Sequence, residues 1–295
     1  MISPRFVFAQ KIIKGTIIDS STGQTIPYAS ITVKNKSSIS WKDGSFLFEL
    51  GSFNNEDSLF VQCLGFEPFK TSLTNYYKNN DKEIKLTPKV FSLNEVIVFA
   101  HNPQKTKIKT LGIYKRKPSD GWATAKYKEQ IALYISNEKR EKGIIQKLKF
   151  YIKKSGTPNK EFRVHLYALD QTKNNPGTEL LPEAIYASGT TGDEWIIIDV
   201  SKYQIKYPPE GFFIAFEALP DSPNDTYISY KKMKFKSPPK NVEFGETYEK
   251  PKDNLTWSYV KFTNDKDYEW KREREPAKDE INGHPMMAAD ILIYK

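Results

Sequence analysis

Short strand-like runs separated by turn residues fill the stretch from Gly15 to Phe69, and they constrain the fold of this chain more than any other feature. The runs are rich in β-branched and aromatic residues, and turns such as Thr22-Gly23 and Asp43-Gly44 divide them. Short runs bounded by Gly, Asn, Asp and Pro are typical of antiparallel sandwiches. Aromatic residues make up 14% of the 295 residues and there are 18 prolines, which favours an all-β chain throughout.

Seven strands are expected before Pro88. The Asp43-Gly44 pair is a strong short-range turn signal and predicts a hairpin between Ile39–Trp41 and Phe46–Leu50. The other expected strands are Lys11–Asp19, Tyr28–Val33, Leu59–Leu64, Phe66–Leu73 and Glu83–Leu86.

This succession of motifs resembles the carboxypeptidase-regulatory-like domain. The motifs that carry the resemblance are Gly15-x-Ile17-x-Asp19, Thr22-Gly23-x-x-Ile26-Pro27-Tyr28-Ala29-Ser30-Ile31, Asp43-Gly44-x-Phe46, Leu64-Gly65-Phe66 and Lys85-Leu86-Thr87-Pro88. The resemblance covers residues 11–98 and implies a transthyretin-like seven-stranded β-sandwich. It also implies a Bacteroidota-like source, because such domains are abundant in the envelope proteins of those bacteria.

Two domains are expected from the length and from the change of pattern after Pro88. The predicted division is residues 1–10 as the remnant of a signal peptide or a tail, 11–90 as the first sandwich, 91–109 as a linker with a short strand, and 110–295 as a second domain. Phe6-Val7-Phe8-Ala9-Gln10 is similar to the end of a secretory signal, which predicts export to the periplasm, outer membrane or cell surface. A disordered tail or an apolar first strand is the alternative. No run approaches the roughly 18 apolar residues of a membrane helix.

The second domain is predicted to be a jelly-roll-like β-sandwich, since eight or more short strands with long connections are expected in it. Pro-, Gly- and Asn-rich turns such as Asn174–Gly177 divide its strands. The candidate strands are Gln130–Ile135, Leu148–Ile152, Phe162–Ala168, Trp195–Val200, Phe212–Ala218, Tyr227–Tyr230, Trp257–Phe262, Tyr268–Trp270 and Ala289–Tyr294. This part is similar to the uncharacterised second domain that follows such modules in related bacteria.

The formal net charge is +9, and basic residues are concentrated between Ala100 and Lys128. In that segment eight basic residues stand against the single acid Asp120. The segment is interpreted either as a solvated linker and exit strand, or as a contact for an acidic partner or phosphate-rich lipid. No nucleic-acid-binding motif is present, so no nucleic-acid partner is expected.

No complete catalytic or metal-binding motif is present. The three histidines, His101, His165 and His284, lack the spacing of a zinc carboxypeptidase site. There is no Gly-x-Ser-x-Gly motif, and Cys63 lies in an apolar run. Asp265, Asp267 and Glu269 alternate and could hold a structural calcium, although alternating acids are more often solvated. No other cofactor is expected.

The best binding candidates are polar residues on two of the expected strands. Lys149, Tyr151 and Lys153 alternate with apolar residues on one strand, and Arg163, His165 and Tyr167 do so on another. If these two runs are neighbours, Tyr151, Arg163, His165 and Tyr167 share one surface that could stack on sugar and fix hydroxyl or carboxylate groups. The alternative is the solvent face of an amphipathic sheet. The tryptophans are expected to be mainly core or edge residues.

These observations predict a non-catalytic cell-envelope binding or assembly protein with a glycan or an envelope protein as partner. An enzyme with a dispersed hydrolase site in the second domain is the first alternative. An accessory component of an outer-membrane uptake system is the second alternative. It rests only on the resemblance, because the resembled domain often precedes an outer-membrane receptor. The oligomeric state is left open.

Overall fold

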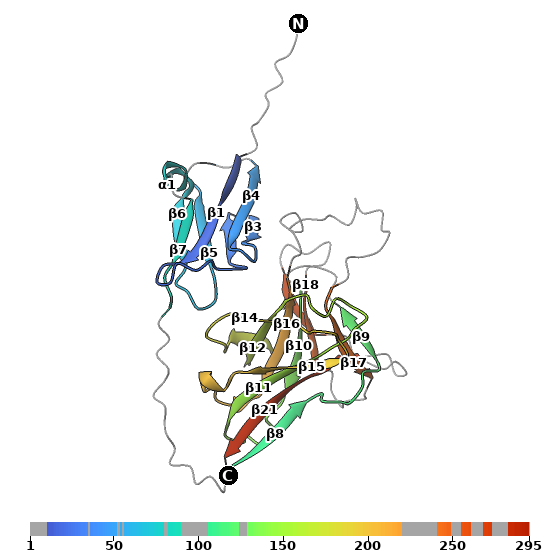
Figure 1. The fold of residues 1–295 in the computed structure, drawn as a ribbon. Helices are drawn as coiled ribbons and strands as arrows, with labels where there is room; N and C mark the ends of the chain where they lie inside the picture. The colour runs from blue at the N-terminus through green and yellow to red at the C-terminus, as the bar shows by residue number, and fades with distance from the viewer. Residues whose placement is uncertain are drawn as a thin grey trace. The chain divides into compact units, whose positions relative to one another are not determined.

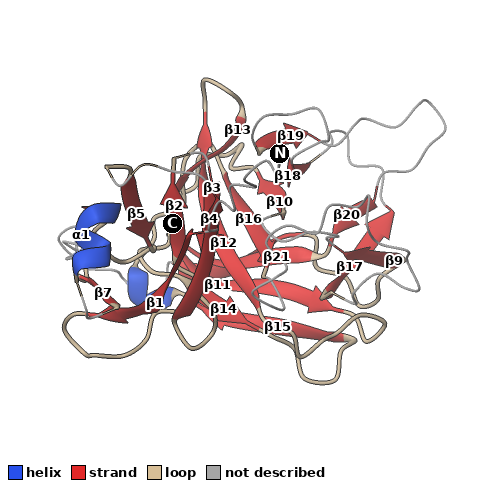
Figure 2. Ribbon diagram, turned by 90° about the horizontal axis from the view of Figure 1, so that it is seen from above, coloured by secondary structure: helices blue, strands red, loops and turns tan. Residues whose placement is uncertain are grey.

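The computed structural model describes residues 11–34, 36–51, 54, 56–79, 82–89, 106–123, 129–219, 241–248, 255–260, 268–272 and 283–294. These residues form two compact units, and almost all of the regular structure in both is β-strand (Figures 1 and 2). The all-β prediction is confirmed. Among the described residues no helix is long and apolar enough to cross a membrane.

The first unit is a sandwich of a four-stranded and a three-stranded sheet (Figure 1). The order is β3-β2-β5-β6 in the larger sheet and β4-β1-β7 in the smaller one, where β1 runs antiparallel to β4 and parallel to β7. Its elements are β1 (Lys11–Asp19), β2 (Ser30–Val33), β3 (Lys36–Ile39), β4 (Ser45–Gly51), β5 (Ser58–Gln62), β6 (Phe69–Ser72), α1 (Leu73–Lys78) and β7 (Glu83–Leu86). The seven-stranded sandwich implied by the resemblance is therefore present.

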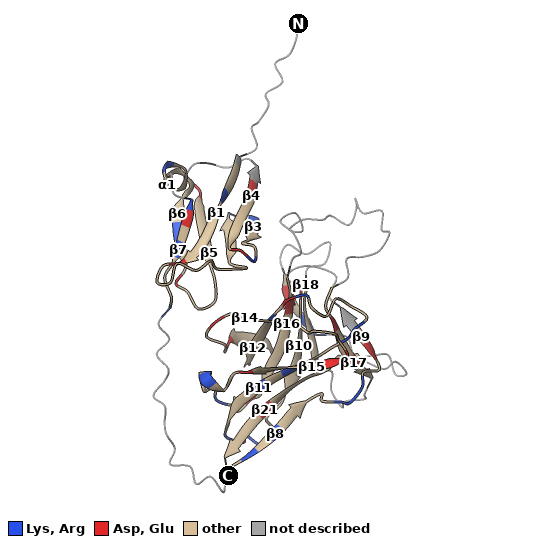
Figure 3. Ribbon diagram, in the orientation of Figure 1, with Lys and Arg blue, Asp and Glu red and all other residues tan. Residues whose placement is uncertain are grey.

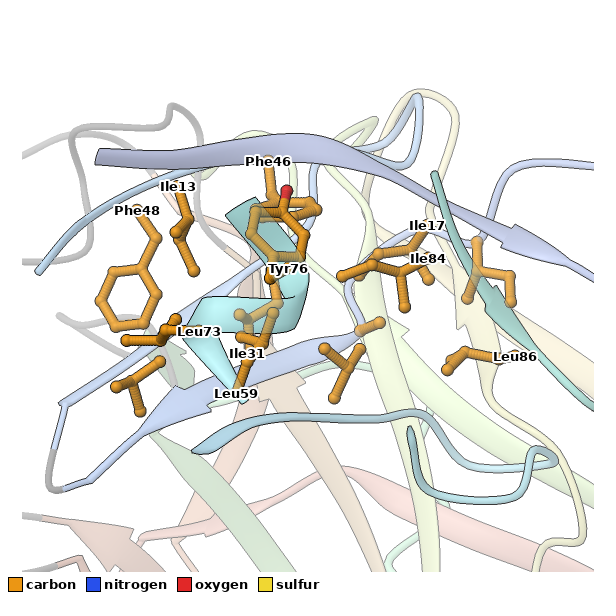
Figure 4. Close-up of a cluster of buried hydrophobic side chains, with 14 residues drawn as sticks. Ile13, Ile17, Ile31, Phe46, Phe48, Leu59, Leu73, Tyr76, Ile84 and Leu86 are labelled. Carbon is orange, nitrogen blue, oxygen red and sulfur yellow. The ribbon is translucent and has the colours of Figure 1, made fainter. Parts of the chain in front are cut away.

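Alternating side chains from both sheets form the core of this unit (Figure 4). Ile13 and Ile17 of β1 face Ile31 of β2 and Leu59 of β5, and all four are almost fully buried. Burying an aliphatic side chain of this size stabilises a fold by about 1.5–3 kcal/mol. The period-two pattern of the sequence thus translates directly into this core.

A short helix follows β6 in a segment where no helix was expected. The Ser72 Oγ accepts a hydrogen bond from the Asn75 N–H at 3.2 Å, which caps the N-terminus of α1. The helix buries Leu73 and Tyr76, and the Tyr76 hydroxyl donates to the Lys14 carbonyl at 2.6 Å. Burial raises the pKa of Tyr76 to about 12. The strand predicted for Phe66–Leu73 was wrong at its end because the cap and the two apolar residues favour one helical turn.

The predicted hairpin around Asp43-Gly44 is also wrong. The turn forms, with the Asp43 Oδ1 accepting from the Ser45 N–H at 3.0 Å, but β3 pairs with β2 whereas β4 pairs with β1. The turn therefore carries the chain from one sheet to the other. Gly44 has a φ of +76°, in the left-handed region that glycine adopts without steric cost.

The second unit contains two seven-stranded sheets, each named by one of its long strands. The β12 sheet has the order β13-β12-β16-β10-β18-β19 with β14 also on β12, and the β11 sheet has the order β20-β17-β11-β21-β8 with β15 on β11 and β9 on β17. Its strands are β8 (Thr106–Gly112), β9 (Asp120–Ala123), β10 (Gln130–Ile135), β11 (Gly143–Ile152), β12 (Phe162–Asp170), β13 (Asn175–Glu179), β14 (Ile185–Ala187), β15 (Glu194–Asp199), β16 (Phe212–Ala218), β17 (Glu243–Tyr248), β18 (Thr256–Val260), β19 (Glu269–Arg272), β20 (Gly283–Pro285) and β21 (Met287–Tyr294). A 3₁₀ helix covers Ser201–Tyr203.

Phenylalanine rings join the two sheets. Phe162 and Phe216 of the β12 sheet meet Phe244 of the β11 sheet, and the centroids of Phe216 and Phe244 lie 3.5 Å apart in a stacked arrangement. Phe150 of β11 contacts Phe162 at 5.5 Å. The sheets therefore pack face to face, as the prediction of a second sandwich requires.

Some sequence predictions in this unit need adjustment. β8 begins at Thr106, inside the expected linker, and Asn175–Glu179 is a strand although part of it was expected to be a turn. Its Pro176 is tolerated because β13 ends the order of the β12 sheet. The short strand expected in the linker, at Leu93–Val98, and the strand predicted for Tyr227–Tyr230 lie outside the described residues.

Replacing Gly44 by alanine should destabilise the first unit more than replacing Gly23. Both glycines have positive φ, +76° and +72°, so either substitution costs about 1–2 kcal/mol of backbone strain. A Cβ on Gly44 would lie 2.7 Å from the Thr25 Cβ and 2.8 Å from the Ile17 carbonyl oxygen, whereas one on Gly23 meets nothing within 4 Å. Hydrogen exchange of residues 11–89 in urea would measure the difference, and equal effects would contradict it.

Candidate functional site

The four predicted binding residues do not share one surface. Tyr151 lies in β11, whereas Arg163, His165 and Tyr167 lie in β12 of the opposite sheet. β11 pairs with β15, β17 and β21, and β12 pairs with β13, β14 and β16. The condition that the two runs are neighbours is not met, because the chain crosses between the sheets after β11. The predicted alternation along each strand is nonetheless present.

His165 lies between two carboxylates. Its Nδ1 is 2.6 Å from the Glu179 Oε2, and its Nε2 is 2.9 Å from the Glu217 Oε2. Its exposed fraction is only 3%, so His165 is not the solvent-facing residue that its alternation predicted. An ionised carboxylate only accepts hydrogen bonds, so a ring that donates from both nitrogens is the protonated imidazolium. The Arg163 guanidinium lies 3.9 Å from the Glu217 Oε2 and adds a second positive charge.

The charges in this network balance, with Arg163 and protonated His165 facing Glu179 and Glu217. The Glu179 Oε1 also accepts from the backbone N–H groups of Leu166 and Leu181, at 2.9 and 3.3 Å. Burial alone would lower the pKa of His165, but the hydrogen bonds from its ring to the two glutamates outweigh that effect and raise the pKa, against the opposing charge of Arg163. Buried charges that are paired and hydrogen-bonded in this way avoid much of the desolvation cost.

These residues belong to three rows of side chains that cross the β12 sheet on the face away from the phenylalanine core. The strand register places the members of each row directly opposite one another. The rows are Tyr134–Phe213–Tyr167–Glu179, Arg272–Trp257–Ala132–Ala215–His165, and Trp270–Tyr259–Gln130–Glu217–Arg163–Tyr186. We call this surface the concave face.

The sheet curls around this face. Tyr167 lies on β12 and Trp270 on β19, and three strands separate them in the sheet order. In a flat sheet this separation would be about 19 Å, at about 4.8 Å per strand. The two ring centroids are nevertheless 5.8 Å apart, so the rings meet across the concavity. This curvature explains why Ala132 and Ala215, in the middle row, are fully buried.

Aromatic rings form a continuous series along the concave face. The ring of His165 stacks on Tyr167 at 5.1 Å, Tyr167 contacts Trp270, and Trp270 contacts Tyr259 at 5.2 Å. Tyr134 and Trp257 flank the buried Phe213 at 5.0 and 6.3 Å. Tyr134, Tyr167, Trp257 and Trp270 are only partly buried. The Tyr167 hydroxyl donates to the Gln130 Oε1 at 2.9 Å, which brings a side-chain amide beside the rings.

Tyr151 belongs to a separate cluster on the outer side of the β11 sheet. Its ring contacts Trp195 at 5.5 Å, and Trp195 contacts Tyr114 at 4.6 Å. The Lys149 Nζ lies 4.5 Å from the centre of the Tyr114 ring and 2.7 Å from the Asp290 Oδ1. Lys149 and Tyr151 are buried, so neither is the solvent-facing residue that simple alternation predicted.

The described residues contain no group of three or more His, Cys, Asp or Glu side chains placed to hold a metal ion. Asp265 and Asp267 of the predicted calcium site lie outside the described part, and Glu269 lies in β19. Cys63 is partly buried and packs against the core of the first unit.

The sequence alone did not identify the partners of His165. Glu179 follows a predicted turn, and Glu217 alternates with apolar residues in β16. The alternation in β16 did indicate that Phe213, Ala215 and Glu217 share a face. Their meeting with β12 depends on strand order, which short-range patterns do not encode.

The fold of the chain is thus that of two consecutive β-sandwiches. Residues 13–98 match the CarboxypepD_reg-like domain family, which confirms the resemblance for the first unit. That domain is a non-catalytic module. No curated protein and no solved structure matches the chain.

Replacing His165 by glutamine should destabilise the second unit and change how its stability depends on pH. Because folding raises the pKa of His165, its protonated ring stabilises the wild-type fold fully below about pH 6.5, the pKa of histidine in the unfolded chain. This stabilisation is lost as the pH rises through the folded-state pKa of His165. Losing the buried cation costs about 3 kcal/mol at low pH. Urea unfolding from pH 5.5 to 9 measures this.

Tyr167→Phe is the matched control, because it removes the hydroxyl that donates to Gln130 and keeps the ring. It should cost about 1 kcal/mol with the wild-type pH dependence. A His165→Gln variant that followed the wild-type curve in parallel would contradict the imidazolium assignment.

Proposed function

We propose that this chain is a non-catalytic binding protein of the cell envelope whose second unit holds a glycan on the concave face. The observation that carries the proposal is the series of partly buried rings that runs from Tyr167 to Trp270 and Tyr259. Aromatic side chains combine a large apolar surface with little conformational freedom. They can therefore stack on the apolar faces of sugar rings without much loss of entropy.

Polar groups lie in the same rows as the rings. Gln130, Glu217 and Arg163 follow one another across neighbouring strands, between Tyr259 at one end and Tyr186 at the other. Glu217 and Arg163 are partly buried and offer a carboxylate and a guanidinium, which suit the hydroxyl and carboxyl groups of a glycan. Gln130 is buried and holds the Tyr167 hydroxyl. Binding sites commonly combine such apolar walls with a few positioned polar groups.

Hydrogen bonds between these groups hold them in place. Glu217 and Glu179 are engaged with His165, and Tyr167 with Gln130. Burial and the neighbouring glutamates raise the pKa of Tyr167 well above its ordinary value, so its hydroxyl stays protonated at neutral pH. Strand-borne groups locked by their neighbours form a pre-organised surface.

The first unit and the start of the chain support the envelope setting. Residues 13–98 match a non-catalytic module, and the segment Phe6–Gln10 is similar to the end of an export signal. Together they favour a protein that lies outside the cytoplasm and whose first unit is a non-catalytic module. An envelope protein as the partner of the concave face is the alternative.

Trp257→Ala and Trp270→Ala should each weaken glycan binding by about tenfold or more, which is about 1.4 kcal/mol. Trp270 bridges the concavity through Tyr167, and Trp257 covers Phe213, so each substitution removes a stacking surface. A polysaccharide and oligosaccharide array would identify the ligand, and isothermal titration calorimetry would measure the loss. Circular dichroism would establish that each variant is folded.

Tyr77→Ala is the matched control, since Tyr77 is an aromatic residue of the first unit that is 38% exposed. It should leave glycan binding unchanged. Equal losses in the control and in the tryptophan variants would place the binding surface elsewhere, and binding unaffected by either tryptophan substitution would refute the concave face.

A further inference from the structure

The strand β15 forms an edge of the β11 sheet. Among the described strands it pairs only with β11, in a register that runs without a shift from Lys147↔Asp199 to Ile152↔Glu194. It is therefore a regular strand with one side unoccupied by any described strand, and it lies at the margin of the sheet in Figure 2. Such an edge can receive a further strand through main-chain hydrogen bonds.

The direction of the backbone groups along β15 follows from one hydrogen bond. The Val200 N–H donates to the Gln146 carbonyl of β11 at 2.9 Å. Because the direction alternates along an antiparallel strand, the amides of Ile196 and Ile198 face β11. Those of Trp195, Ile197 and Asp199 face away from it.

β15 lacks the features that usually protect an edge from pairing. Its sequence is Glu-Trp-Ile-Ile-Ile-Asp, with no proline or lysine. By contrast, the edge strand β8 carries Lys107 and Lys109. The two acids of β15, Glu194 and Asp199, are engaged by nearby groups.

Both carboxylates fold back onto neighbouring backbone. The Glu194 Oε1 accepts from the N–H groups of Thr190, Thr191 and Gly192 at 2.6, 2.9 and 3.0 Å. The Asp199 Oδ1 accepts from the Ser201 N–H at 2.9 Å. Neither acid therefore projects as a free charge along the edge.

The surroundings of β15 are apolar and basic. Ile197 is 53% exposed and Tyr114 is 49% exposed. The Trp195 Nε1 donates to the Lys115 carbonyl at 3.2 Å, which holds the exposed residues Lys115, Arg116 and Lys117 beside the start of the strand. Elsewhere Lys and Arg are interspersed with Asp and Glu over both units (Figure 3).

We infer that β15 is a docking edge for an extended segment of an acidic partner polypeptide, which adds a strand beside Trp195, Ile197 and Asp199. A polypeptide supplies both the N–H and C=O groups that this edge requires. Apolar side chains of the segment would cover Ile197, and acidic ones would face Lys115–Lys117. A second copy of the chain suits the edge less well, because its net charge of +9 opposes self-association. Because β15 belongs to the β11 sheet, this inference and the glycan proposal can fail independently.

Hydrogen exchange resolved to single amides tests the inference on the full chain. The probe is a synthetic ten-residue peptide of alternating valine and glutamate. Without peptide, the amides of Trp195, Ile197 and Asp199 should exchange faster than those of Ile196 and Ile198. Saturating peptide should slow these three by about tenfold or more. The same peptide N-methylated on every amide should have no effect, because neither of its edges can then donate hydrogen bonds.

Ile197→Glu should abolish the slowing, because it replaces the apolar contact with a charge of the same sign as the peptide. Ile108→Glu is the matched control, since Ile108 is 65% exposed on the edge strand β8, and it should behave as wild type. Three outcomes would overturn the inference: no slowing with the peptide, equal slowing with a valine-lysine peptide, or slowing that rises with protein concentration alone. The last would assign the edge to a second copy of the chain.

Discussion

The stacking of Phe216 on Phe244 is the contact on which the second unit depends, because it joins the two sheets. The ring centroids lie 3.5 Å apart, and Phe150 and Phe162 complete the same layer. Once this face of each strand is committed to the core, period-two alternation sends the intervening side chains to the opposite face. The concave face of the β12 sheet and the Tyr114–Trp195 cluster of the β11 sheet are both consequences of that division.

The concave face forms a second buried cluster outside the core between the two sheets, and this cluster contains both apolar and charged side chains. Curvature of the sheet brings Trp270 to Tyr167 and buries Phe213, Ala132 and Ala215. Charged groups share this space, because His165 is held between Glu179 and Glu217. Their arrangement satisfies the hydrogen bonds of the imidazole ring and balances its charge, which limits the cost of burying them. Polar groups held in place therefore lie beside partly buried rings.

Prediction from the sequence succeeded where local pattern decides structure. The strand predicted for Lys11–Asp19 is present as β1 with those bounds, and the turn motifs led to the family that matches residues 13–98. It failed at Asp43-Gly44, where the turn formed as expected but joined two sheets, and after Ser72, where a side-chain cap begins a helix that was not expected. In both cases the local residues allowed two outcomes, and packing selected one.

By itself, the sequence determined the all-β class, the sandwich of the first unit and the alternation that groups Arg163, His165 and Tyr167 on one side of β12. Only the tertiary structure decided which strands are neighbours. It separated Tyr151 from those three residues, brought Glu179 and Glu217 to His165, curled the sheet around Phe213 and left β15 at an edge. The physical reason is that alternation depends on the geometry of a single strand. Strand order, in contrast, depends on contacts between residues far apart in the chain.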